Sequence, residues 1–479
     1  MYDIIIIGAG VVGSLLARKL SSYELSVLVI EKENDVGNAT SEANSAVVHS
    51  GYDPEPGTLK AKLNVLGNKM FPKICEELDV HLNNIGSLTV AIYDEQLKIL
   101  EDLKKRAEIN GVEVKLLNKE ETLEIEPNLS SEVKGSLFAP TAGVVNPFTL
   151  VVHAIENAVD NGVKLALDEK VVNIVNNKEN FEVITDKNSY VGRIVVDCAG
   201  VYSDEIHSLV EPIDYEINPR KGEYFVLDHY GQNLVNHTIF PLPSEKGKGV
   251  LVTPTTSNNF LVGPSSEYVK DKEDTSTDKE TLDKVKASAK LLVPNIPFQH
   301  AIRTFSGLRS TPSTHDFIIR PSKVSSRFIV AAGIESPGLV SSPAIAEYIV
   351  NNFISKEIEL KTKISYNPYV RKRIRMNELS VEKRNAYIKK HPEYGKIVCN
   401  CEKVSLGEIL DELNSSVPPK TIKAVKKRTR AGFGKCQGGF CQPLVLRQLA
   451  KYLKKSKSEI MLDKKGSFIA RYLTKEDKE

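Results

Sequence analysis

The chain has 479 residues, of which 41% are hydrophobic and 26% charged, and its formal net charge is +2. This length exceeds what one hydrophobic core supports and predicts roughly two to four domains. The near balance of acidic and basic residues excludes a nucleic-acid-binding protein that is attracted by overall charge. No apolar run approaches the length of a transmembrane segment, and the N-terminus leads directly into a strand pattern. We therefore expect a cytoplasmic protein without a signal peptide, and peripheral membrane contact stays open.

The chain begins with the pattern strand, glycine turn, helix, strand. Residues 3–7 are a β-branched run typical of a buried strand, residues 12–20 repeat apolar residues at helical spacing, and residues 26–30 form a second strand before Glu31. Three glycines between the first strand and the helix have dinucleotide-binding spacing: Gly8, Gly10 and Gly13. Such a turn approaches a pyrophosphate closely, and the acid meets a ribose hydroxyl. The pattern predicts a nucleotide site but leaves NAD and FAD open.

Strand-like and helix-like patterns alternate over residues 1–365, which predicts an α/β domain. Within it we expect substrate-domain segments at about 85–145 and 215–300, where the later segment has short strands separated by Gly, Pro and polar turns. The densely charged residues 270–286 predict a solvated loop that leads into a helix.

The C-terminal part divides into three predicted segments. Residues 366–396 are basic, lack apolar periodicity and are interpreted as a linker. Residues 397–455 form a compact module with four cysteines, and residues 456–479, rich in Lys and Ser, are expected to be a loosely held tail.

Three later segments identify the nucleotide. Residues 193–200 and 328–333 are buried strands that end in Ala-Gly, and residues 334–339 contain a glycine turn that opens a helix. Together with residues 44–51, this set resembles the D-amino-acid-oxidase-like family of FAD oxidoreductases over residues 1 to about 360. The resemblance implies a Rossmann-type FAD-binding domain interleaved with an antiparallel-sheet substrate domain. No cysteine lies near His49, so we expect FAD to be bound non-covalently.

Within that family, residues 44–54 and 247–254 are similar to glycerol-3-phosphate dehydrogenases and oxidases and, to a lesser degree, to 2-hydroxyglutarate oxidases. The resemblance implies a set of flavin-binding residues spread over the α/β domain: Gly8, Gly10, Val12, Gly13, Glu31, Lys32, Ser41, Asn44, Ser45, Val172, Ala199, Gly200, Gly307, Gly333, Pro337, Gly338 and Leu339.

The candidate active site combines a base with cations for an anionic substrate. Oxidation of an alcohol requires a base within hydrogen-bond reach of the hydroxyl, and His49 is the best candidate, although it could instead pack or position the flavin. In the family an arginine at the position of Arg309 binds the substrate's carboxylate or phosphate. Arg320 is a second phosphate ligand or a surface ion pair. Lys248, between two glycines, reaches the substrate or is simply exposed, and Ser336 hydrogen-bonds flavin or substrate.

The four C-terminal cysteines have the arrangement C-x-C followed by C-x4-C: Cys399, Cys401, Cys436 and Cys441. Four thiolates suit a [2Fe–2S] cluster or zinc, and neither pair has the C-x-x-C spacing common in zinc sites. The segments resemble the module named after bacterioferritin-associated ferredoxin, whose usual second pair is C-x-x-C. We expect a [2Fe–2S] cluster, with the basic surface from Lys426 to Lys435 as a docking face for an acidic redox partner protein.

The leading functional hypothesis is FAD-dependent oxidation of sn-glycerol 3-phosphate to dihydroxyacetone phosphate, with electrons passed through the cluster to a partner. A 2-hydroxy-acid dehydrogenase is the alternative within the enzyme class, and an electron-transfer or iron-handling adaptor is the alternative outside it. The final acceptor and the oligomeric state stay open.

Overall fold

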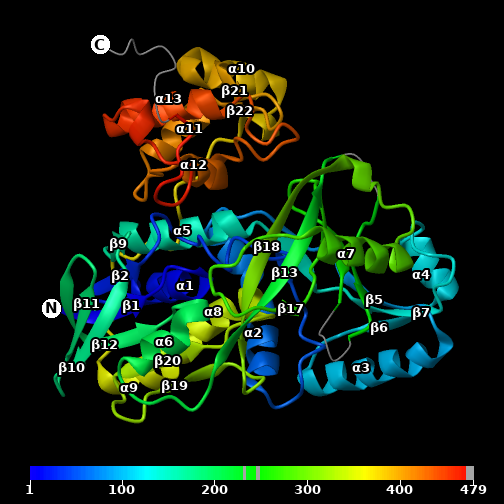
Figure 1. Cartoon of the computed structure of the whole chain (residues 1–479), viewed down its shortest axis with the longest axis horizontal. Helices are drawn as coiled ribbons and strands as arrows, with labels where there is room; N and C mark the ends of the chain where they lie inside the picture. The colour runs from blue at the N-terminus through cyan, green and yellow to red at the C-terminus, as the bar shows by residue number, and fades with distance from the viewer. Residues whose placement is uncertain (230–233, 244–248, 471–479) are drawn as a thin grey trace.

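The computed structural model describes residues 1–229, 234–243 and 249–470 (Figure 1). Within them, an eight-stranded sheet has the order β10-β11-β12-β1-β2-β9, with β20 beside β12 and β19 beside β20. Its strands are β1 (Tyr2–Ile7), β2 (Val27–Glu31), β9 (Lys164–Leu167), β10 (Val171–Asn176), β11 (Phe181–Thr185), β12 (Ser189–Asp197), β19 (Ile318–Pro321) and β20 (Phe328–Ala332). The central strands β12, β1, β2 and β20 pair in parallel, as the buried apolar runs predicted.

Helices pack against this sheet and form the larger core. The helix α1 (Val11–Leu20) connects β1 to β2 and packs against α5 (Pro147–Asp160) and α8 (Gly338–Ile349). On the far side of α8 lies α2 (Leu59–Glu77). A Cβ atom on Gly67 would lie 2.0 Å from the Val340 carbonyl oxygen, so only glycine permits this close approach of α2 and α8. The helix α6 (Ser203–Ser208) follows β12.

A second, nine-stranded sheet has the order β17-β13-β16-β15-β14-β5-β7-β6, with β18 beside β13. All its pairs are antiparallel except β5 with β14. Its strands are β5 (Ser87–Ala91), β6 (Lys115–Asn118), β7 (Gly135–Ala139), β13 (Ile217–Leu227), β14 (Thr238–Pro241), β15 (Leu251–Pro254), β16 (Phe260–Gly263), β17 (Glu267–Tyr268) and β18 (Ala301–Pro312). The chain therefore enters this sheet twice, and the predicted interleaved α/β fold is confirmed.

Shorter elements complete the oxidoreductase part. The helices α3 (Leu97–Asn110), α4 (Lys119–Ile125) and α7 (Lys279–Leu292) lie along the second sheet. A small sheet of β3 (Val47–Val48), β8 (Gly143–Val145) and β4 (Leu82–Asn83) supports the segment before His49. The charged stretch predicted to be a loop leading into a helix does so: α7 begins after Asp278, whose side chain accepts a hydrogen bond from the Thr281 N–H.

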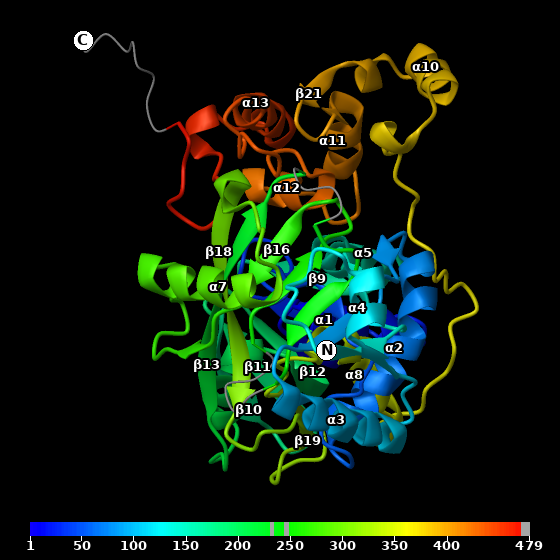
Figure 2. The same cartoon turned by 90° about the vertical axis from the view of Figure 1, so that its right-hand side faces the viewer.

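The C-terminal module is a separate small layer above α5 (Figures 1 and 2). It consists of β21 (Ile397–Cys399), β22 (Val404–Ser405), α11 (Leu406–Leu413), α12 (Ile422–Thr429) and α13 (Gln442–Leu453). Its own core is centred on Ile409, Leu413, Val425 and Leu449, each fully buried. The helix α12 faces the oxidoreductase part and contacts α5.

Two C-terminal segments are more ordered than expected. The predicted linker contains α10 (Val381–Lys390), and Ser380 caps the N-terminus of this helix. The linker runs along one side of the molecule to the module (Figure 2). The tail expectation is wrong for residues 456–470, because Ile460 is 1% exposed and Met461 pairs with Phe468 in a β-bridge. In the described part of the chain, no helix is both long and apolar enough to cross a bilayer.

Candidate functional site

A cavity of about 460 Å³ lies where the two large sheets meet. The N-terminus of α1, the segment after β2, strands β13 and β18, and the start of α8 all contribute to its wall. The structure brings these predicted residues together in its lining: Gly10, Val12, Ser41, Asn44, Ser45, His49, Gly200, Gly307, Arg309, Ser336, Pro337, Gly338 and Leu339. Most of the predicted site therefore shares one space.

The glycine turn at the N-terminus of α1 is tightly packed. A Cβ atom on Gly13 would lie 2.0 Å from the Gly8 carbonyl oxygen, so the turn and the helix could not meet this closely with a larger residue. The Ser41 hydroxyl accepts a hydrogen bond of 2.9 Å from the Val11 N–H. Glu31 ends β2 and accepts a bond of 2.7 Å from the Ala9 N–H, so its carboxylate lies beside the turn. Burial raises the pKa of Glu31.

A second helix N-terminus faces the same cavity. Ser336 and Pro337 lead into α8, which begins at Gly338. Two helices thus direct the positive ends of their dipoles and their first N–H groups at one space, which suits a cofactor with a pyrophosphate and an anionic ring edge. A Cβ atom on Gly307 would lie 2.0 Å from the Ala43 carbonyl oxygen, so the backbone of β18 also approaches the wall closely.

Arg309 presents a half-buried guanidinium to this cavity. It lies opposite Arg220 in the register of β18 and β13 and contacts the Tyr224 hydroxyl. Its Nη1 atom is 3.5 Å from the Ser265 carbonyl oxygen. In the described residues it forms no ion pair, and burial lowers its pKa.

The other cations of the cavity are paired. Glu335 binds the Lys60 ammonium at 2.8 Å and the Arg220 guanidinium at 2.7 Å. Burial alone would raise the pKa of Glu335, but these two cations lower it below its ordinary value. The Glu335 carboxylate therefore forms ion pairs with Lys60 and Arg220 but not with Arg309, whose guanidinium is available to an anionic ligand.

His49 follows β3 and lines the cavity next to Phe240, with ring centroids 5.7 Å apart. Its carbonyl oxygen accepts hydrogen bonds from the side-chain amides of Asn64 at 2.8 Å and Asn68 at 3.1 Å, both on α2. These bonds fix the backbone at His49, so the imidazole is held by a well-anchored segment.

Several predicted residues lie elsewhere. Of the two alternatives for Arg320, the structure shows the surface ion pair: Arg320 binds Asp214 and is absent from the cavity lining. Lys32 pairs with Glu273 at 2.7 Å, and Val172 lies on β10 with 48% of its surface exposed. Lys248 lies outside the described residues. The remaining predicted residues support the turns without lining the cavity: Gly8, Gly13, Glu31, Ala199 and Gly333.

Sequence reasoning missed Lys60, Arg220, Tyr224 and Glu335. Glu335 precedes Ser336 in residues 334–339, which the sequence already indicated as a flavin-binding turn, so its charge could have marked it as a site residue. Arg220 and Lys60 carry no local signal, because the pairing of β13 with β18 and the packing of α2 bring them in from distant parts of the chain.

The four module cysteines form two facing pairs of thiols. The sulfur atoms of Cys401 and Cys436 are 3.7 Å apart, and Cys399 shares a hydrogen bond with Cys441. Two thiolates bound tetrahedrally to one metal ion at about 2.3 Å lie about 3.8 Å apart. The Cys441 thiol, together with nearby backbone N–H groups, lowers the pKa of Cys399 to about 6.

The backbone around the cysteines also suits an iron–sulfur site. Backbone N–H groups of Gly438 and Phe440 point at the Cys436 sulfur, as in iron–sulfur sites. The donor set therefore fits a [2Fe–2S] cluster.

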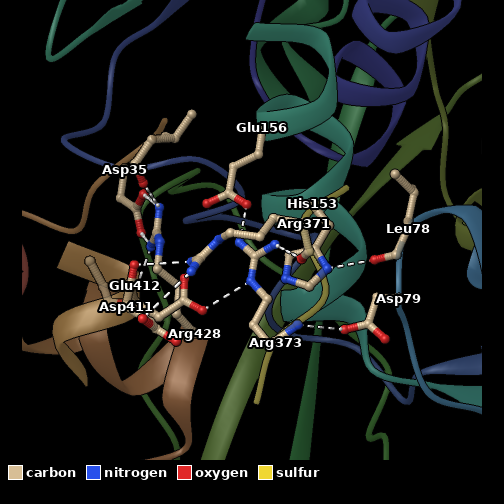
Figure 3. A network of polar contacts seen from close by, with 12 residues as sticks. Asp35, Leu78, Asp79, His153, Glu156, Arg371, Arg373, Asp411, Glu412 and Arg428 are labelled. Atoms are coloured by element: carbon tan, nitrogen blue, oxygen red, sulfur yellow. Dashed lines mark hydrogen bonds and ion pairs between the residues drawn. The ribbon is translucent and has the colours of Figure 1, made fainter. Parts of the chain in front are cut away.

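The expected basic docking face is wrong for its central residues. The side chains of Lys427 and Arg428 are 3% and 1% exposed, because both bind Asp35 of the oxidoreductase part. Lys435 is exposed. Arg373 of the linker adds a bridge between Glu156 on α5 and Glu412 on α11 (Figure 3).

Comparisons with known proteins agree with this geometry. The sequence profile of the FAD dependent oxidoreductase family matches residues 3–352, and that of the BFD-like [2Fe-2S] binding domain matches residues 397–451. A glycerol 3-phosphate dehydrogenase from Caloramator mitchellensis is 45% identical over 480 residues, with 100% of each chain covered. A glycerol 3-phosphate oxidase from Mycoplasma genitalium is 33% identical over 76% of this chain and 97% of its own length.

A solved structure is similar as well. The dithionite-reduced L-alpha-glycerophosphate oxidase from Mycoplasma pneumoniae, with FAD bound, has a TM-score of 0.74 and 32% identity. The match covers 77% of this chain and 98% of that one. The glycine turn, the two helix N-termini and the shared cavity fit FAD, and with these matches they show that the chain belongs to the FAD dependent oxidoreductase family and carries a BFD-like [2Fe-2S] binding domain.

Proposed function

We propose that the chain oxidises sn-glycerol 3-phosphate to dihydroxyacetone phosphate. The relative of matching length is named a glycerol 3-phosphate dehydrogenase, and the similar FAD-bound structure is a glycerophosphate oxidase. The observation that carries the proposal is Arg309, a half-buried cation that forms no ion pair with any described residue and shares a cavity with His49. Such a cation is stabilised by an anionic ligand such as a phosphate.

The residues divide the chemistry between them. FAD, when bound, supplies the acceptor for the hydride on the alcohol carbon. His49 takes the hydroxyl proton on its imidazole. Arg309 binds the phosphate through its two Nη groups, and Ser336 donates a hydrogen bond to the flavin or the substrate. Lys248 is proposed as a further substrate contact on the segment before β15.

The module extends this function to electron transfer. We propose that its [2Fe–2S] cluster passes electrons to an acidic redox partner protein. Cys436 is half-buried and Phe440 beside it is 82% exposed, so the cluster end of the module is accessible, and Lys435 adds a positive charge there. None of the six cysteines, all within the described residues, forms a disulfide bond, and we propose a cytoplasmic location.

Anaerobic flavin reduction tests the reaction. The purified protein is mixed with sn-glycerol 3-phosphate, glycerol, L-2-hydroxyglutarate or glycine, and the loss of the oxidised flavin absorbance is followed. We expect rapid bleaching with glycerol 3-phosphate alone. Equal bleaching by glycerol would contradict the role of Arg309 as a phosphate ligand.

The same panel tests the second candidate, a 2-hydroxy-acid dehydrogenase. An L-2-hydroxyglutarate dehydrogenase from Escherichia coli is 28% identical over 56% of this chain, and Arg309 could bind a carboxylate as well as a phosphate. Bleaching by L-2-hydroxyglutarate alone would select this candidate. No bleaching with any compound, in protein that retains flavin, would favour the electron-transfer adaptor.

A further inference from the structure

Residues 34–42, here called the hinge segment, lie between the flavin cavity and the C-terminal module. The segment follows β2 and contains no helix or strand of its own. On its inner side, the Gly37 N–H donates to the Ala9 carbonyl at 3.0 Å, and the Ser41 hydroxyl accepts from the Val11 N–H. Thr40 and Ser41 also line the cavity. The hinge segment therefore fixes the glycine turn and the N-terminus of α1.

The outer side of the hinge segment is bound by α12. The Lys427 ammonium group binds three acceptors of the hinge segment: the Asp35 carboxylate at 2.8 Å, the Val36 carbonyl at 2.8 Å and the Asn38 side chain. Arg428 binds both oxygens of Asp35, each at 2.8 Å (Figure 3).

Two further contacts join the ends of the hinge segment to the module and to the ordered residues that follow it. The Asn34 side-chain amide donates to the Asp463 carbonyl at 2.6 Å, and Lys423 binds Glu42 at 2.6 Å. Lys423 also binds the Asp463 carboxylate at 2.8 Å. The module and the residues that follow it therefore contact the hinge segment from its first residue to its last.

The chemistry of these contacts makes them specific. An ammonium group has three donors, and all three of Lys427 are used within one short stretch of four residues. Both Lys427 and Asp35 are almost fully buried, so loss of one partner leaves an uncompensated charge in the interior. Without the module, the segment would keep its inner contacts but lose every one of these outer contacts.

We propose that Lys427 and Arg428 are positioning residues for the flavin site, and that docking of the module and binding of FAD stabilise each other through the hinge segment. The reaction and its substrate play no part in this coupling. Binding equilibria coupled through a shared element must respond reciprocally, so each partner strengthens the other by the same factor.

The first test measures FAD affinity in the full-length protein after removal of flavin, with FAD fluorescence as the readout. Lys427→Gln should raise the dissociation constant by about 5- to 150-fold, the usual range of coupling between sites. Lys427→Arg should recover part of the affinity. Lys451→Gln, an exposed lysine of α13 in the same module, is the matched control and should bind like wild type.

Hydrogen exchange and proteolysis provide readouts that a general loss of stability would not reproduce. In Lys427→Gln, exchange should accelerate in residues 34–46 more than in β1 or β12. In the wild-type protein, added FAD should slow tryptic cleavage after Arg371 and Lys372 in the linker, because it favours the docked module.

An unchanged FAD dissociation constant in Lys427→Gln, with the module's cluster absorbance retained, would overturn the proposal. If that variant loses the cluster absorbance, Lys423→Gln repeats the test at the Glu42 contact, where the lysine side chain is 27% exposed and less critical for folding. Wild-type FAD affinity in Lys423→Gln as well would then refute the coupling. None of these measurements uses substrate, so they are independent of the proposed reaction.

Discussion

Arginines in two regions of the molecule have opposite surroundings. In the flavin cavity, Arg309 is half-buried and has no ion-pair partner among the described residues, and partial burial lowers its pKa. At the module interface, the Arg428 side chain is 1% exposed, but Asp35 more than offsets the effect of burial and raises its pKa. Arg373 is similarly enclosed by Glu156 and Glu412. A desolvated cation without a carboxylate partner indicates a ligand site, whereas a cation whose partners are buried carboxylates indicates a structural contact between domains.

The largest expected effect is in the cavity, at His49. His49→Ala should lower the rate of flavin reduction by about 10²- to 10⁴-fold, because a positioned base is lost. Flavin content and the unfolding midpoint should stay the same, since side-chain amides of α2 hold the segment through the His49 carbonyl and not through the imidazole. Stopped-flow absorbance measures the rate, with His391→Ala in the linker as the control. A wild-type rate would mean that His49 packs in the cavity or positions the flavin and is not the base.

At the interface the effect should fall on stability instead. Arg373→Gln leaves two buried carboxylates facing each other and should lower the free energy of unfolding by about 3–5 kcal/mol. Denaturant titration measures this change, while flavin reduction per bound flavin should be retained. Arg371→Gln is the control, because Arg371 is half exposed and its pair with Asp411 should contribute less than about 1 kcal/mol. Equal losses in the two variants would remove the distinction between buried and exposed partners.

Arg309 gives the sharpest contrast with Arg373. Arg309→Leu should raise KM for glycerol 3-phosphate by about 10- to 150-fold, which corresponds to the roughly 1.5–3 kcal/mol of a charged hydrogen bond. The free energy of unfolding should not fall, because the variant removes a desolvated charge that has no carboxylate partner. Steady-state kinetics and denaturant titration are compared on the same preparation. A stability loss like that of Arg373→Gln would show that Arg309 is a structural cation.

The smallest effect is expected at Arg320. Arg320→Ala removes a partly exposed ion pair with Asp214 and should change the free energy of unfolding by less than about 1 kcal/mol. KM for glycerol 3-phosphate should match that of the wild type. A higher KM would restore Arg320 as a phosphate ligand and would weaken the case that Arg309 suffices.

The local parts of the site could be predicted from sequence, and the long-range parts could not. The glycine turn, Glu31 and the start of α8 are recognisable because short stretches carry their geometry. The pairing of Glu335 with Arg220 depends on packing between β13 and the start of α8, which no local pattern encodes. The basic run of α12 was interpreted as a surface because its partner, Asp35, lies far away in sequence.

The same sequence distance affects how the protein is made. Lys427 and the Val36 carbonyl that it binds are 391 residues apart. At usual rates of translation, about 5–20 residues per second, the hinge segment leaves the ribosome roughly 20–80 s before α12 is synthesised. During that interval the Asp35 carboxylate faces water and the first nucleotide-binding unit is incomplete. Under the proposed coupling, the flavin site gains its full affinity for FAD only after α12 has been translated and has bound the hinge segment.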